Sequence, residues 1–383
     1  MVITENNMKD QKMIKRITSI LLILVFAVSL LSSCADKDFY PEIESTEEEK
    51  RVVFKFNVGE EVYEVRYELY RTLFLTYKKE VDGGDNSVWT SANAKQYIDR
   101  IDRMIIDAAA NIFTVLHLAK EAGFDPYSDE VNTTIREYVK RSVDGYEDDG
   151  VSIKGFNGDY NAYLDSLKAV YMNYSVQTLI YRYAIAYDKL LLHYYGNVSE
   201  DNPNEQTQGA IKYTDETLRD YYYGNDSVRV ILATINSKYI SEERAQEIRY
   251  NIASYSTETS VINYIISATS TTAADAQIGL LIGKYAMDST LFSNTLATAA
   301  FNLSYHETSP VINYDVNGET YYYIFYRTDK SDTYFENNKD AIIASYMGNE
   351  IGRMLSEGKS EVESRVVREA LMSELDRSSI AMP

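Results

Sequence analysis

The spacing of apolar residues predicts that the first half of the chain is helical. Apolar side chains recur three and four positions apart and form stripes, which is typical of amphipathic helices. Before them, Phe54, Phe56 and Val58 alternate with other residues, as in a short strand with one buried face. We therefore expect a helical domain over residues 52–196. Its helices are predicted at about 65–77, 91–121, 128–143 and 159–195.

The pattern changes after a polar stretch. Residues 197–212 lack periodicity and contain Pro203 and Gly209, so we interpret them as an interdomain linker. Val228 to Ile235 then forms an almost continuous apolar run, which is typical of a buried strand. Two further apolar runs flank Asn317-Gly318, a dipeptide that favours a hairpin turn. Helical spacing lies between these strands, at 241–254 and 258–268. The pattern therefore predicts a second domain over residues 213–330, and an α+β protein overall.

Helical spacing returns at the end of the chain, over 336–356 and 360–377. We expect residues 331–383 to be C-terminal helices that pack on the helical domain.

The N-terminus has the features of an export signal. Lys15 and Arg16 precede an apolar stretch, Ile20 to Leu31, which is too short to span a bilayer comfortably. Leu31-Ser32-Ser33-Cys34 closes the stretch and resembles the lipobox of bacterial lipoproteins, in which the peptide is cut before the cysteine and the cysteine receives lipid. We expect a signal peptide over 1–33 and lipidation of Cys34. The alternative is an ordinary secretory peptide with an incidental cysteine.

The residues after Cys34 are acidic and lack an apolar helical face. We interpret 34–51 as a disordered tether. Its acidic run also resembles the surface-export signal of Bacteroidetes lipoproteins, although a simple solvated linker explains it equally well. The expected location is the outer membrane of a bacterium, on the periplasmic face or the cell surface.

Composition excludes several classes of function. The chain has 383 residues and a formal charge of −20, which argues against nucleic-acid partners and against adsorption to anionic lipid headgroups. Cys34 is the only cysteine, so no intramolecular disulfide or cysteine-based metal site is possible. The three histidines lie far apart, and no zinc-protease, phosphate-loop, nucleophile-elbow or dinucleotide motif occurs. No cofactor or metal is expected, and the oligomeric state is left open.

Several motifs, in order, resemble the exported foldases and chaperones of the SurA and PrsA class. The segment 118–143 is similar to the helix-turn-helix of that family, and 213–235 to the entry of its parvulin-type prolyl isomerase domain. IGLLIG at 278–283 stands where the family has Gly-Asp-Leu-Gly, LATAAFNL at 296–303 matches its F-E-E-A-A-F-A-L, and SPVI at 309–312 its S-x-P-V. The resemblance covers about residues 52–377.

The resemblance also assigns candidate site residues. Val230 and Tyr323 occupy the positions of the family's two histidines, and Thr320 stands where some members have a hydroxyl residue. Phe292, Leu296 and Phe301 stand near the family's proline-pocket residues, with Phe292 the least secure because the alignment there needs an insertion. Side chains at such spacing also commonly belong to a core. The resemblance therefore implies prolyl isomerase activity that is weak or lost.

The function expected from these features is that of a lipid-anchored chaperone for unfolded exported or outer-membrane polypeptides. The chain's 35 tyrosines would suit transient binding of apolar, aromatic-rich segments, although they also suit half-buried helix faces. Two alternatives stay open: an active peptidyl-prolyl cis/trans isomerase, and a non-enzymatic surface lipoprotein that binds one dedicated partner.

Overall fold

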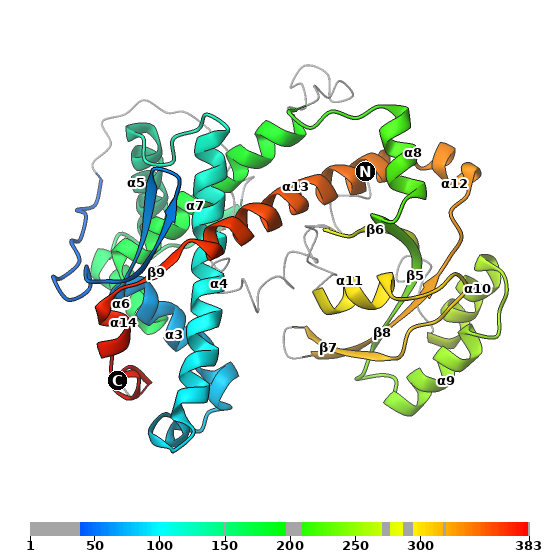
Figure 1. Ribbon diagram of the computed structural model, residues 1–383, viewed down its shortest axis with the longest axis horizontal. Helices are drawn as coiled ribbons and strands as arrows, with labels where there is room; N and C mark the ends of the chain where they lie inside the picture. Colours follow the sequence, from blue (N-terminus) through cyan, green and yellow to red (C-terminus); the bar gives the residue numbers. More distant parts are fainter. Residues whose placement is uncertain are drawn as a thin grey trace. The chain divides into compact units, whose positions relative to one another are not determined.

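The computed structural model describes residues 39–148, 151–196, 209–269, 276–285, 294–316 and 319–381 (Figure 1). The predicted signal peptide, Cys34, most of the linker, Phe292 and the Asn317-Gly318 turn lie outside these ranges. The described chain is mixed α+β, as predicted. It divides into two compact units. One, the sheet unit, contains the described residues between Tyr194 and Met354, and the other, the helical unit, contains those up to His193 and from Leu355 onward. The second boundary between the two units, at Met354/Leu355, lies within a helix and not at the expected 330/331 boundary.

The helical unit begins with a small antiparallel sheet. Strands β1 (Val52–Val58) and β2 (Glu61–Arg66) form a hairpin, and the sheet order is β2-β1-β9. Phe54, Phe56 and Val58 are buried, which confirms the predicted face of the first strand.

The helices of this unit follow the apolar stripes closely. In α4, the buried positions include Ile101, Ile105 and Ile112, at helical spacing. The Ser128 hydroxyl accepts a hydrogen bond from the Val131 N–H and so caps the next helix. The elements are α3 (Tyr67–Asp82), η2 (Asn86–Thr90), α4 (Ala94–Glu121), α5 (Asp129–Asp144), β3 (Tyr146–Asp148), β4 (Val151–Ile153), α6 (Tyr160–Ala169) and α7 (Tyr174–Tyr195).

The C-terminal residues correct one prediction. A helix over 360–377 is wrong, because α13 (Lys339–Ser364) is followed by a strand, β9 (Val366–Arg368), which pairs antiparallel with β1. The two β-branched valines of β9 suit an extended conformation, and β1 offers a free edge to them. Two short helices follow, α14 (Ala370–Glu374) and α15 (Arg377–Ala381), and they contact β1 and α3 within the same unit.

The acidic residues before β1 also differ from expectation. A disordered tether is wrong for residues 39–51, which contact the helices of this unit. The ring of Tyr40 stacks on Tyr160 of α6 with 4.9 Å between centroids, and the Ser45 hydroxyl donates to the buried Glu68 of α3. The sequence did not predict these contacts, because they depend on single side chains and not on a periodic apolar face.

The sheet unit contains a four-stranded antiparallel sheet in the order β6-β5-β8-β7 (Figure 1). The strands are β5 (Ser227–Asn236), β6 (Ala276–Gly283), β7 (Ile312–Val316) and β8 (Glu319–Arg327). At one end, α8 (Asp215–Tyr223) packs against α12 (Asp332–Asn337) and the start of α13 through Tyr222, Phe335 and Ile342.

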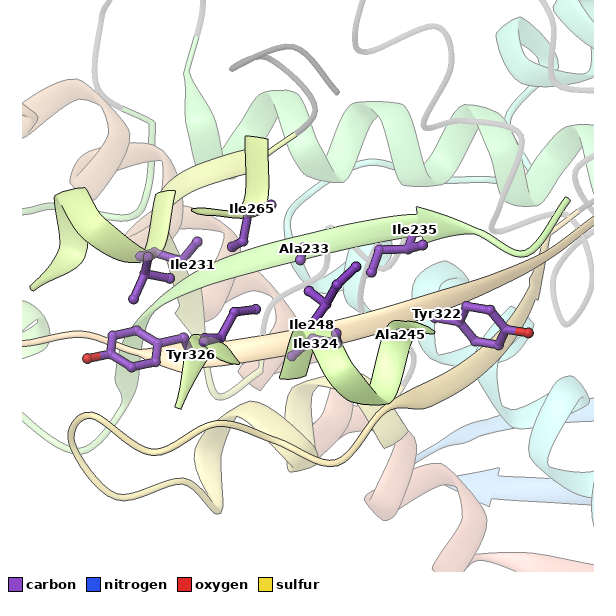
Figure 2. Packing of buried hydrophobic residues seen from close by; sticks show 11 residues of the cluster. Ile231, Ala233, Ile235, Ala245, Ile248, Ile265, Tyr322, Ile324 and Tyr326 are labelled. Atoms are coloured by element: carbon purple, nitrogen blue, oxygen red, sulfur yellow. The ribbon is translucent and has the colours of Figure 1, made fainter. Parts of the chain in front are cut away.

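Helices cover both faces of this sheet. On one face, α9 (Glu242–Ile252) and α10 (Glu258–Thr269) pack against Ile231, Ala233 and Ile235 of β5 and against Ile324 of β8. Figure 2 shows Tyr322 and Tyr326 at the two ends of this cluster, with their hydroxyls directed away from it. On the other face, α11 (Asn294–Phe301) packs against the sheet. Within the described ranges, no helix combines the length and the apolar character needed to cross a bilayer.

Candidate functional site

The two positions that the resemblance assigns to histidines lie on the same face of the sheet. Directly opposed residues of β5 and β8 include Leu232 with Phe325 and Thr234 with Tyr323. Because opposed residues of antiparallel strands share a face and faces alternate along each strand, Val230 and Tyr323 both point toward α11. Both belong to the apolar cluster beneath that helix.

The two positions are nevertheless not opposite each other. Val230 is paired with Arg327, four residues from Tyr323, and the Leu232–Phe325 pair lies between them. At a rise of about 3.4 Å per residue, the offset along the strands is about 14 Å between Cα atoms. Side chains at these positions therefore share one cluster without facing each other directly.

Helix α11 supplies two further predicted residues. Leu296 is fully buried in the cluster, and Phe301 packs against it while partly exposed. Val230 is 0% exposed and Tyr323 is 1% exposed. The structure thus brings four of the predicted residues together, and these form packed core.

The predicted polar residue Thr320 and the side chain that His306 contacts lie on the opposite face of the sheet. Thr320 precedes Tyr323 by three residues on β8, so it shares the side of Tyr322 and not that of Tyr323. His306 is the histidine of the sheet unit, and its Nδ1 lies 3.1 Å from the Tyr326 hydroxyl, while its Nε2 is 2.9 Å from Asp329. Because Tyr326 belongs to the α9–α10 face, His306 does not replace either missing histidine.

Sequence reasoning missed Tyr321, which borders the α11 cluster. Its ring centroid is 6.5 Å from that of Tyr323, and its hydroxyl donates to Glu319 over 3.0 Å. The Asn236 amide donates to the same carboxylate over 3.1 Å. Burial and the Glu319 hydrogen bond raise the pKa of Tyr321. The alternation of the strand, which places Tyr321 and Tyr323 on one face, was the signal that could have identified it.

This arrangement is packed core and offers little acid–base chemistry. At the two histidine positions stand an isopropyl group and a phenol, both buried among aliphatic and aromatic side chains. Beside this cluster, Tyr321 has a phenol with a raised pKa, and the Glu319 carboxylate accepts hydrogen bonds from it and from the Asn236 amide. In the part of the chain that the structure describes, no group of three or more His, Cys, Asp or Glu side chains could hold a metal ion.

Comparisons with known proteins give two similar solved structures. The foldase protein PrsA from Streptococcus pneumoniae strain Canada MDR_19A has 14% sequence identity and a TM-score of 0.26, with 79% of this chain and 94% of that chain covered. PrsA from Bacillus subtilis has 15% identity and a TM-score of 0.23, with 86% and 98% covered. Values this low do not establish a common overall arrangement. No protein-family model matches the chain, and no curated protein matches it.

Proposed function

We propose that this protein is an exported chaperone that binds unfolded polypeptides, and that its sheet unit keeps the framework of a parvulin-type isomerase without the catalytic pair. The observation that carries this proposal is that Val230 and Tyr323 lie on the same face of the sheet. Both residues lie in one apolar cluster with Leu296 and Phe301 of the covering helix α11, which supports the proposal.

The same observation argues against isomerase activity. An X–Pro bond isomerises over a barrier of about 18–20 kcal/mol, which an enzyme lowers by desolvating the imide and stabilising its twisted state. Electrostatic stabilisation needs donors directed at the site where charge develops. Val230 has no donor, and Tyr323 is only 1% exposed. The cluster therefore acts as structural core, and the resulting unit serves binding.

Exposed tyrosines supply the binding surface in this proposal. Tyr239, Tyr250 and Tyr305 of the sheet unit are 78%, 67% and 50% exposed. Each carries a cation near its ring: Lys238 at 5.7 Å, Arg249 at 5.2 Å and Arg327 at 4.7 Å from the centroid. Tyrosine offers a large, amphipathic contact area at low rotamer cost, which suits weak contacts with many sequences.

Attachment to a membrane completes the proposal. We place the lipid on Cys34 and the protein at the outer membrane, on the periplasmic face or the cell surface. Mass spectrometry of the mature protein, looking for a lipid-modified N-terminal cysteine, tests this part separately.

The chaperone role is tested by light scattering during dilution of two unrelated, chemically denatured proteins. At a near-equimolar ratio, the chain should suppress the aggregation of both. Joint replacement of Tyr239 and Tyr250 by alanine should weaken suppression, whereas Val62→Ala, an exposed apolar change on the helical unit, should not. Aggregation of both proteins at the unassisted rate would refute the proposal and favour an accessory lipoprotein with one dedicated partner, to be sought by co-purification.

A further inference from the structure

The first described residues hold a tyrosine in a site built from the helical unit. Tyr40 stacks on Tyr160 with centroids 4.9 Å apart and planes at 21°, and Tyr160 stacks in turn on the buried Tyr163 at 6.0 Å. The Tyr40 hydroxyl donates to Asp144 over 2.5 Å, with the Gly158 carbonyl at 3.4 Å as a second acceptor. The site therefore provides both an aromatic face and a hydroxyl acceptor.

Charged groups complete this site. The Lys140 ammonium lies 5.8 Å from the centroid of the Tyr40 ring and pairs with Asp144 over 2.9 Å. The hydrogen bond to Asp144 raises the pKa of Tyr40 to about 12, and the same bond lowers the pKa of the Asp144 carboxyl. Phenol and carboxylate thus stay in the protonation states that their hydrogen bond requires at neutral pH.

A second contact is made to the main chain of residues 39–45. The Tyr160 hydroxyl donates to the carbonyl oxygen of Pro41 over 2.6 Å. Every peptide residue has such a carbonyl, so this contact does not depend on the side chain that follows the tyrosine. Arg136 adds an ion pair with Glu42 at 3.2 Å, an exposed contact of small energy.

The segment that fills the site is attached through side chains and one carbonyl, without backbone pairing to other described residues. Pro41, Glu42 and Ile43 are exposed, and in the described part no backbone-to-backbone hydrogen bond joins residues 39–45 to the helices. By contrast, the Glu68 N–H donates to the Glu49 carbonyl a few residues later, where the chain joins the fold. Residues 39–45 are held by the Tyr40 ring and hydroxyl, the Pro41 carbonyl, the Ser45 hydroxyl on Glu68 and one exposed ion pair. Because each contact uses a single group, another segment that offers the ring, the hydroxyl and the carbonyl can take the same place.

We propose that the Tyr160 surface, formed by Arg136, Lys140, Asp144, Gly158 and Tyr160, is a binding site for a tyrosine-bearing extended segment of an unfolded polypeptide. Residues 39–45 are its resident occupant, which such a segment displaces. This inference rests on the proposed chaperone function for the identity of its ligand. The site itself is defined by contacts within the helical unit.

Fluorescence anisotropy of a labelled peptide with the sequence of residues 39–45, FYPEIES, tests the inference. The chain with Tyr40→Ala should bind this peptide at least about tenfold more tightly than the unaltered chain, as expected if the resident segment leaves the site free about a tenth of the time. Adding Tyr160→Ala to Tyr40→Ala should abolish binding. Replacing the peptide's tyrosine by phenylalanine should weaken binding, because the bond to Asp144 is lost.

Two results would overturn the inference. One is equal binding of the peptide to the unaltered and Tyr40→Ala chains. The other is an absence of binding to a Tyr40→Ala chain whose thermal unfolding is unchanged, which would make residues 39–45 a fixed part of the fold. Aggregation assays are scored separately. Peptide binding without aggregation suppression would refute the proposed function and leave the site in place, and suppression without peptide binding would do the reverse.

Discussion

Asp82, at the C-terminal end of α3, should make a large contribution to the stability of the helical unit. None of its side-chain surface is exposed. Its carboxylate accepts hydrogen bonds from the Gly84 N–H at 2.7 Å and the Trp89 indole N–H at 2.9 Å, and it pairs with Lys78 at 2.9 Å. Asp82→Asn keeps the shape of the side chain and removes its charge.

The size of the effect follows from these three partners. In the variant, the amide oxygen can still accept from Gly84, but the NH₂ group then faces the indole N–H and the ammonium. Two donors lose their acceptor, and a buried donor left unsatisfied costs about 1–3 kcal/mol, or more when it is charged. We expect the free energy of unfolding to fall by about 2–4 kcal/mol.

Trp89 provides the assay, because it is the only tryptophan in the chain and is 3% exposed in this unit. Urea unfolding followed by its fluorescence should show a lower midpoint for Asp82→Asn. Asp99→Asn, which removes a half-exposed carboxylate on α4, should change the midpoint little. Equal midpoints for Asp82→Asn and the unaltered chain would refute the reasoning.

The contribution of the Asp82 carboxylate to stability should also depend on pH. Burial alone would raise the pKa of Asp82, but the bonds from Lys78, Trp89 and Gly84 outweigh it and hold the pKa below its ordinary value. A lowered pKa stabilises the fold above the unfolded-state value, and this contribution is lost as pH falls through the folded-state value. Asp82→Asn should therefore show a smaller loss of stability than the unaltered chain between about pH 5 and pH 3.

Three further changes have defined outcomes. Arg377→Ala leaves the buried Asp102 without its ion-pair partner at 3.2 Å, and it should lower the free energy of unfolding by about 3–5 kcal/mol, measured by Trp89 fluorescence. Adding Asp102→Leu should recover part of this loss. Ile248→Ala leaves a cavity where α9 packs on the sheet, and it should lower the free energy of unfolding of the sheet unit by about 2–5 kcal/mol. The loss would be measured as faster amide hydrogen exchange in β5. Tyr323→Phe should leave aggregation suppression unchanged, since the proposal gives its hydroxyl no role in binding. The first prediction fails if the urea midpoint of Arg377→Ala is unchanged, and the second if Ile248→Ala leaves amide exchange in β5 unaltered. The third fails if Tyr323→Phe no longer suppresses aggregation.

The sequence predicted elements with regular periodicity well. The continuous apolar run of β5 identified a buried strand, because helices cover both faces of its sheet. The helical spacing over 91–121 and 128–143 predicted α4 and α5 with nearly the right bounds. These features are local, so they can be recognised from residue types and spacing alone.

Features that depend on distant contacts could not be predicted in the same way. Strand β9 forms because β1, about three hundred residues earlier in the chain, offers it an edge. Tyr40 is ordered by stacking on Tyr160 of a remote helix. At the candidate site, Val230 and Tyr323 lie on one face of the sheet, and only the pairing register shows that they do not face each other. The same register and alternation remove Thr320 from the site.

If the sheet unit lacks a catalytic pair, as we propose, the chain should not accelerate the cis/trans isomerisation of a proline peptide. NMR exchange spectroscopy can measure the isomerisation rate at rising concentrations of the chain. The rate should stay at the uncatalysed value, with time constants of tens to hundreds of seconds. A rate that rises in proportion to protein concentration, and returns to the uncatalysed value with Tyr323→Ala, would contradict the proposal.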